Sequence, residues 1–269
     1  MQTPRRSRSS SNPVRHLRDN LRSSPVLRFS DLRVLMSASF FDAIGFMGEQ
    51  VAIGWLVLEL TDDPFMVGVA IAMRMAPLFF LGIIAGTIAD MVDRRLLIRA
   101  LNMCMALLLI GIGTLIFNDL LQVWHLLAFS VLGGCIMAVH QSARQSLAFD
   151  VVGREYLMGG LAYVGLGMRL GGLVGSIVAG YLIKDAGADI AYWVLAGGYV
   201  VSTLLLSLIR SPGQASRSRQ PILRNLREFA DELRRNNPLL TLVIIVAATE
   251  TLGFSSGAAF PSLARDVLD

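Results

Sequence analysis

The chain alternates between long uncharged apolar stretches and short segments that carry nearly all of its charge. Seven stretches of about 19 residues or more hold few charged residues: 34–60, 66–88, 96–117, 123–143, 157–183, 191–209 and 239–260. About 20 apolar residues cross the roughly 30 Å hydrocarbon core of a bilayer as an α-helix. Lipid offers no hydrogen-bond partner to the backbone, so helices are the structures that such stretches form. The pattern therefore predicts an all-α membrane protein with seven transmembrane helices.

Composition strengthens this prediction and excludes some classes of function. Apolar residues make up 54% of the chain and charged residues 16%, whereas soluble domains carry about 25% charged residues. A nucleic-acid-binding protein is thereby excluded in spite of the net charge of +4. Cys104 and Cys135 both fall within apolar stretches, where cysteines pack as small hydrophobic residues. We expect the lipid bilayer as the main partner.

Basic residues are distributed unequally between the two sides of the predicted membrane. The segments before the first stretch and after the second, fourth and sixth stretches, together with Arg99 at the start of the third stretch, hold 20 of the 24 Lys and Arg residues. The opposite side holds only Lys184 and Arg265. Because cytoplasmic loops carry an excess of Lys and Arg, we expect a multi-pass protein of the cytoplasmic (inner) membrane. Its N-terminus would be cytoplasmic, and seven crossings would leave the C-terminus of this chain outside.

The same pattern predicts four regions. Residues 1–30 form a disordered basic cytoplasmic tail, and residues 31–210 form a bundle of six helices. Residues 211–237 form a cytoplasmic loop in which apolar and basic residues alternate at helical spacing, which is typical of an amphipathic helix on a membrane surface. Residues 238–269 hold the seventh helix.

The segment between the second and third stretches carries a short motif. Gly86, Asp90, Arg94 and Arg95 have the spacing G-x-x-x-D-x-x-x-R-R. A glycine lets two helices approach closely, and a carboxylate can accept charge-assisted hydrogen bonds from arginines. The spacing resembles the signature loop of the major facilitator superfamily, which implies a gate at this position. A plainer alternative is that these charges only fix the orientation of the second helix.

Further segments resemble one branch of that superfamily. Asp93 stands where the commonest form of the motif has glycine, and this variant is similar to the exporter branch that includes enterobactin exporters and transmembrane secretion effectors. The residues Ala143-Arg144-Gln145 with Asp150 are also similar to that branch, as are segments 234–238 and 264–268. The resemblance covers nearly the whole chain after the basic tail.

The resemblance implies a secondary transporter with two six-helix bundles around a central site, which works by alternating access. We expect proton-coupled export of small organic molecules of drug or siderophore type, without a cofactor. Since that architecture has twelve helices, we expect an N-terminal bundle plus one helix of an incomplete second bundle. Either the chain is truncated or a second chain supplies a missing C-terminal half. The alternatives are a seven-helix receptor or sensor and an inactive half-transporter fragment.

Five charged residues fall well inside the apolar stretches, away from their ends: Asp42, Glu49, Arg74, Arg169 and Glu250. Each would cost roughly 2.5–3.5 kcal/mol at the centre of a transmembrane helix, so they should face the bundle interior, a wet cavity or one another. Counting residues from the cytoplasmic ends places Glu49 level with Arg74, and Asp42 level with Arg169. The two pairs either hold helices together or carry protons along the transport pathway.

The fifth stretch contains small residues at every fourth position, among them Gly167, Gly171 and Gly175. Such a series permits tight helix packing, and a gating hinge is the alternative. No nucleophile–base pair and no cluster of His, Cys and acidic residues with metal-ligand spacing is visible in the sequence. We therefore expect neither an enzyme nor a metal site.

Overall fold

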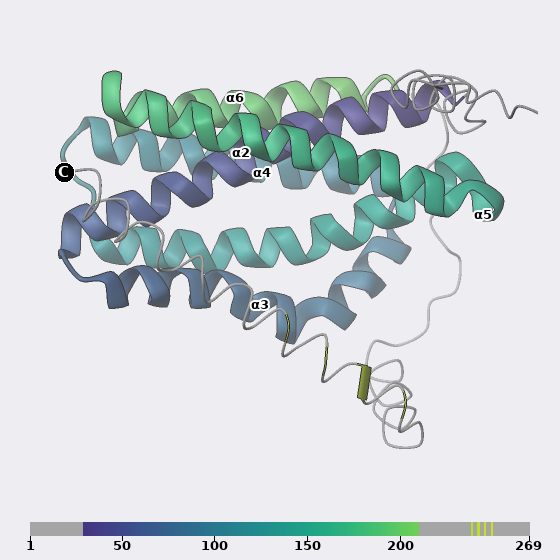
Figure 1. The fold of residues 1–269 in the computed structure, drawn as a ribbon, viewed down its shortest axis with the longest axis horizontal. Coiled ribbons are helices and arrows are strands. Elements are labelled where there is room, and N and C mark those ends of the chain that lie inside the picture. The colour runs from purple at the N-terminus through teal and green to yellow at the C-terminus, as the bar shows by residue number, and fades with distance from the viewer. Residues whose placement is uncertain (1–28, 210–237, 239–240, 243–244, 246–248, 250–269) are drawn as a thin grey trace, which may run out of the picture.

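The computed structural model describes residues 29–209 and five positions between 238 and 249 (Figure 1). The basic tail to residue 28, the predicted amphipathic helix in 211–237 and most of the seventh stretch lie outside the described residues. Within the described part, the regular structure is helical and contains no strand. The prediction of an all-α membrane protein is confirmed.

Between residues 29 and 209, five helices follow one another: α2 (Ser30–Thr61), α3 (Pro64–Met91), α4 (Arg94–Phe117), α5 (Val123–Asp185) and α6 (Ala188–Leu206). Each is long and apolar enough to cross a membrane. The 63-residue α5 is interrupted at Gly153, whose φ of 71° and ψ of 177° are not helical. Glycine adopts positive φ without steric cost, so α5 has two arms that correspond to the fourth and fifth predicted stretches.

An aspartate caps the N-terminus of both α3 and α4. The Oδ1 of Asp63 accepts a hydrogen bond from the backbone N–H of Phe65 at 2.9 Å. Asp93 accepts one from the backbone N–H of Arg95, also at 2.9 Å. An aspartate at this position satisfies a backbone N–H that the first helical turn leaves unpaired. The charged breaks between apolar stretches therefore also provide the caps that start the next helix.

The helices run side by side (Figure 1). Their buried apolar side chains form two clusters. One cluster includes Leu109 and Tyr192, and the other includes Leu147 and Leu206 near the α3–α4 loop. Along α2, Ala38 belongs to one cluster and Ala52 to the other. Buried Asp42 and Glu49 lie between these two alanines, so the charges occupy the middle of the bundle.

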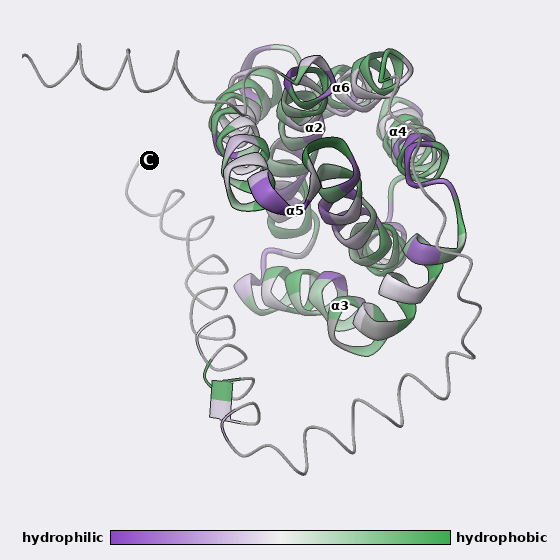
Figure 2. Ribbon diagram, turned by 90° about the vertical axis from the view of Figure 1, so that its right-hand side faces the viewer, coloured by the Kyte–Doolittle hydropathy of each residue, from purple (hydrophilic) through white to green (hydrophobic). Residues whose placement is uncertain are grey.

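Large apolar side chains also cover the outside of the bundle. They include Phe80, Leu107, Ile177 and Leu204, all of which are exposed. Figure 2 shows hydrophobic residues on all of the labelled helices around the bundle. A soluble monomer exposes such residues only in small patches, so this surface suits contact with lipid on several sides.

Helix α5 packs closely against α2 along its glycines. Gly167, Gly171 and Gly175 face the backbone carbonyls of Met36, Phe40 and Ile44, respectively, on α2. A Cβ atom added to any of the three would collide with these carbonyls. The small residues therefore allow the two backbones to approach, which is how such series act in membrane helices.

We predict that Gly171→Ala lowers the free energy of unfolding by about 1–3 kcal/mol, because the added methyl group overpacks the contact with Phe40. Gly180→Ala in the same helix is the matched control, since a Cβ there meets no atom within 4 Å. Thermal unfolding of the purified chain in detergent would measure both variants. Equal stabilities of the two variants would contradict the close contact.

Candidate functional site

Glu49 and Arg74 form an ion pair in the middle of the bundle. The Nη2 of Arg74 donates to the Oε2 of Glu49 at 2.8 Å, and its Nη1 donates to the Oε1. The side chains are 0% and 3% exposed, respectively, and the Arg74 guanidinium lies 5.1 Å from the ring centroid of Phe46. Buried charges cost several kcal/mol each unless they are paired. The structure thus brings together the first of the two predicted pairs.

The second predicted pair, Asp42 with Arg169, is wrong. Arg169 is exposed and makes no ion pair with any residue that the structure describes. It lies two positions from both Gly167 and Gly171, and two positions turn a helix by about 200°. Arg169 therefore points away from the face of α5 that packs on α2. Counting residues gives the depth of a side chain but not its direction.

Asp42 lies instead in a cluster of polar side chains. Its Oδ1 accepts a hydrogen bond from the Nδ2 of Asn102 at 2.8 Å, and the same Nδ2 lies 3.1 Å from the Oγ of Ser202. The Nε2 of His140 lies 3.6 Å from the Oδ2 of Asp42. Asn102 and Ser202 are not among the site residues that the sequence predicts. Their signal is a polar residue inside an otherwise apolar stretch.

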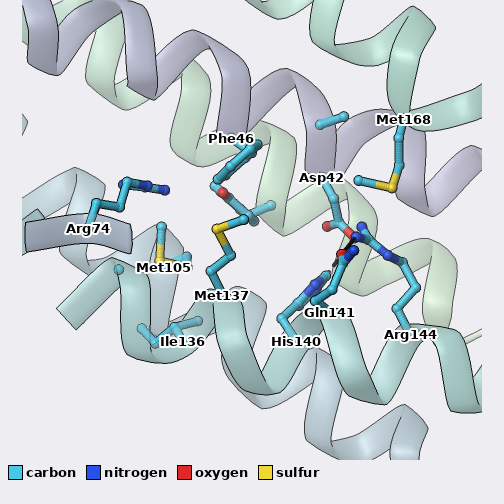
Figure 3. A pocket seen from close by; sticks show the side chains of 13 residues that line it. Asp42, Phe46, Arg74, Met105, Ile136, Met137, His140, Gln141, Arg144 and Met168 are labelled. Carbon is cyan, nitrogen blue, oxygen red and sulfur yellow. Dashed lines mark hydrogen bonds and ion pairs between the residues drawn. The ribbon is translucent and has the colours of Figure 1, made fainter. Parts of the chain in front are cut away.

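A pocket adjoins this cluster and draws its walls from all five helices (Figure 3). Its empty volume, including the open mouth, is about 480 Å³. Figure 3 shows Asp42, His140, Gln141 and Arg144 together on one side and Arg74 on the other. The remaining labelled wall is apolar: Phe46, Met105, Ile136, Met137 and Met168. Methionines adapt to ligands of varied shape.

Arg144 is a buried lining residue of this pocket and not a loop residue. The sequence pattern ends the fourth helix at residue 143 and counts Arg144 among the cytoplasmic charges. In the structure α5 continues beyond that point, and Arg144 is buried and donates a hydrogen bond to the Oε1 of Gln141. That predicted boundary is wrong because the helix does not end where its apolar run ends.

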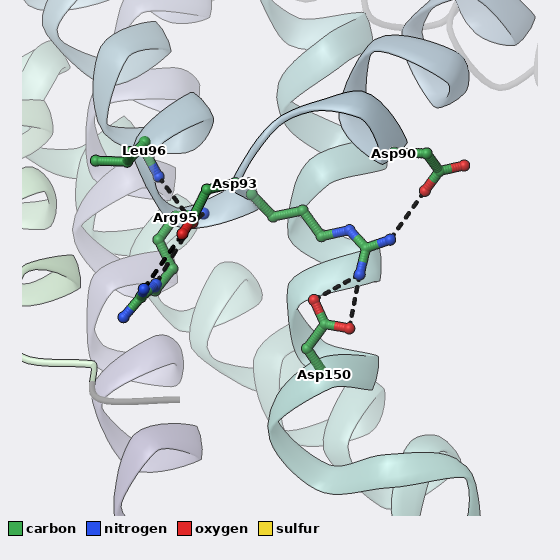
Figure 4. A network of polar contacts seen from close by, with 6 residues as sticks. Asp90, Asp93, Arg95, Leu96 and Asp150 are labelled. Carbon is green, nitrogen blue, oxygen red and sulfur yellow. Dashed lines mark hydrogen bonds and ion pairs between the residues drawn. The ribbon is translucent and has the colours of Figure 1, made fainter. Parts of the chain in front are cut away.

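The α3–α4 hairpin carries a network of charged residues (Figure 4). The Nη1 of Arg94 lies 2.6 Å and 2.5 Å from the two carboxylate oxygens of Asp150 on α5, and its Nη2 lies 3.0 Å from the Oδ1 of Asp90. The side chain of Asp150 is 7% exposed and that of Asp90 is 54% exposed. The stronger partner of Arg94 is therefore Asp150, because exposed ion pairs contribute little.

Arg95 makes a separate connection from this hairpin. Its Nη1 donates to the backbone carbonyl of Ile209 at 3.0 Å, and its Nη2 lies 3.2 Å from the Oδ2 of Asp93. Burial raises the pKa of Asp93, but hydrogen bonds from Arg95 and from the backbone N–H of Leu96 outweigh this effect, so the pKa lies below its usual value. Asp93 is therefore ionised at neutral pH, and Arg95 ties the start of α4 to the end of α6.

The remaining predicted residues are placed as follows. The close helix contact expected at Gly86 is wrong, because a Cβ there would meet only the Oγ of Ser142 at an ordinary 3.7 Å. Glu250 lies outside the described residues. The part of the chain that the structure describes holds no group of three or more His, Cys, Asp or Glu residues placed to bind a metal ion. A role of the predicted site residues in transport stays a prediction.

Comparison with known proteins gives a consistent result. The sequence model of a family described as transmembrane secretion effectors matches residues 23–269. The chain is 27% identical over 229 residues to proteins described as the enterobactin exporter EntS from Salmonella choleraesuis, Citrobacter koseri and Escherichia coli O1:K1. These matches cover 82% of this chain and 53% of each relative. The chain therefore spans about half the length of the curated relatives that it matches.

We predict strong coupling between Glu49 and Arg74 in a double-mutant cycle. Arg74→Met should lower the free energy of unfolding by about 3–5 kcal/mol, because it leaves a buried carboxylate unpaired. Adding Glu49→Gln should restore part of this loss, as no unpaired charge then remains. Arg169→Met is the matched control and should change stability by less than about 0.5 kcal/mol, because Arg169 is exposed. If the changes in the free energy of unfolding caused by Arg74→Met and Glu49→Gln simply add in the double variant, the two residues do not stabilise each other.

We also predict that Asp150→Asn destabilises the chain more than Asp90→Asn does. Asp150 is the buried partner of Arg94, whereas an exposed pair such as Asp90–Arg94 contributes about 0.2–1 kcal/mol. Thermal unfolding in detergent at constant salt would compare the two variants. A larger loss for Asp90→Asn would show that the exposed carboxylate is the main partner.

Proposed function

Because the chain belongs to the transmembrane secretion effector family of the major facilitator superfamily, we propose that it functions in the export of small organic molecules. In this proposal, transport proceeds by alternating access in the cytoplasmic membrane and is coupled to protons. The chain would have its basic N-terminus in the cytoplasm. The distribution of Lys and Arg supports this orientation, since cytoplasmic segments are rich in these residues.

The pocket is the observation that carries the proposal. It lies among membrane helices and combines Asp42, His140 and Arg144 with an apolar wall of methionines and Phe46. Charged groups within a membrane generally mark the path of a substrate or a proton. A pocket with a few polar groups on an apolar wall suits an amphiphilic small molecule.

The names of the relatives suggest which molecule to test first. Proteins described as enterobactin exporters share 27% identity with this chain, so a siderophore is the first candidate. The apolar wall of the pocket also suits hydrophobic drugs, which form the second candidate class. The proposed activity concerns the chain in whatever assembly it forms, including one in which a second chain supplies further helices.

We predict that the chain moves enterobactin into an acidic compartment in exchange for protons that leave it. The chain would be produced in an Escherichia coli strain that lacks its own enterobactin exporter. Inverted membrane vesicles from this strain would then be acidified inside. They should accumulate enterobactin above the level of vesicles without the chain, and a protonophore should abolish the difference. Lys184→Gln is the control and should transport normally, since Lys184 is exposed at the end of α5 and does not line the pocket.

Binding of enterobactin without accumulation would contradict the proposed export. That result would favour the receptor or sensor alternative, because a receptor binds its ligand without moving it. Accumulation that persists after the proton gradient is dissipated would contradict proton coupling but retain export.

A further inference from the structure

The carboxylates in the middle of the bundle differ in their freedom to exchange a proton. Both oxygens of Glu49 accept hydrogen bonds from Arg74, and neither side chain is more than 3% exposed. Proton binding to Glu49 would break a charge-assisted pair and leave a buried guanidinium uncompensated, which is strongly unfavourable. Asp42 has no such partner, because the side chains that hydrogen-bond to it, Asn102 and Ser202, are neutral.

His140 lies next to Asp42 without a hydrogen bond to it. The separation of 3.6 Å between Nε2 and Oδ2 exceeds a hydrogen-bond length. This Nε2 is buried and has no hydrogen-bond partner among the described residues. The side chains of Asp42 and His140 keep 6% and 12% exposure, respectively, and both line the pocket. A small movement would therefore let the two groups share one proton.

We propose that Asp42 and His140 together hold the exchangeable proton of the pocket, and that this proton competes with a hydrogen-bond donor of the substrate for Asp42. This assignment rests on the proposed export function. The ion pair of Glu49 and Arg74 then has a structural role. The exported molecule is a neutral or cationic compound with hydroxyl or amine donors on an aromatic or apolar body.

The charged and polar groups on all packed helices agree with this assignment. They are Asp42 and Ser39 on α2, the paired Arg74 on α3, Asn102 on α4, His140, Gln141 and Arg144 on α5, and Tyr199 and Ser202 on α6. Arg144 donates to Gln141, so its charge lies near Asp42 without occupying the carboxylate. When Asp42 is ionised and His140 is neutral, Asp42 and Arg144 balance each other. One added proton leaves the pocket with a positive charge.

The proton transfer is simple to write. The N–H bond of protonated His140 breaks, an O–H bond to the carboxylate of Asp42 forms, and the imidazole becomes neutral. A carboxylate accepts stronger hydrogen bonds than a protonated carboxyl group. The proton therefore weakens the hold on a substrate donor, and loss of the proton restores it. An apolar body of the substrate would contact Phe46 and the methionines of the wall.

Infrared spectroscopy of the full chain in lipid nanodiscs tests this assignment directly. On acidification, wild-type protein should gain the C=O stretching band of a protonated carboxylic acid. Asp42→Asn should lose that band, whereas the double variant with Glu49→Gln and Arg74→Met should keep it. Enterobactin added at the pH of half-protonation should reduce the band in the wild type, because its hydroxyl donors compete with the proton.

His140→Gln provides a second test with Asp42 in place, should Asp42→Asn fold poorly. This variant should keep the band but move the pH at which it forms. A band that persists in Asp42→Asn, that vanishes in the double variant, or that forms at an unchanged pH in His140→Gln would overturn the assignment. A band that enterobactin leaves unchanged would overturn the competition. None of these results depends on the transport rate. The vesicle experiment therefore tests the proposed export independently of this assignment.

Discussion

Buried charge in the middle of a membrane bundle is the constraint on which the structure depends. Apolar clusters fill both ends of the bundle, so each charged group between them requires a partner within reach. Glu49 and Arg74 meet this requirement with two hydrogen bonds to each other. Asp42 meets it with the amide of Asn102 and the neighbouring His140. The first solution pairs two opposite charges across α2 and α3, and the second surrounds a carboxylate with neutral hydrogen-bond donors.

Close helix packing brings these groups within reach. The glycines of α5 let its backbone contact α2, which carries both Asp42 and Glu49. On the other arm of α5, Gly133 leaves space for the guanidinium of Arg74, and Gly134 lies against the backbone carbonyl of the same residue. At the α3–α4 hairpin, Arg94 joins α4 to Asp150 on α5. Small residues and ion pairs thus determine together how the helices enclose the pocket.

The sequence predicts the helices well, because a bilayer demands long apolar stretches and charged breaks separate them. It also places Glu49 level with Arg74, since depth follows from counting residues at a constant rise. It fails for Arg169, because depth does not determine the direction of a side chain. It misplaces Arg144, because α5 continues past its apolar run as far as Gly153. The pocket depends on contacts among all five helices, which no local pattern contains.

The central claim is that the two buried carboxylates have different roles. Experimental structures of the chain in lipid at acidic and at alkaline pH would test it most directly. The distance of 3.6 Å between His140 and Asp42 should shorten to a hydrogen bond at the pH where they share a proton, while Arg74 and Glu49 stay paired at both pH values. Separation of Arg74 from Glu49 at acidic pH, with Asp42 and His140 unchanged, would contradict the account.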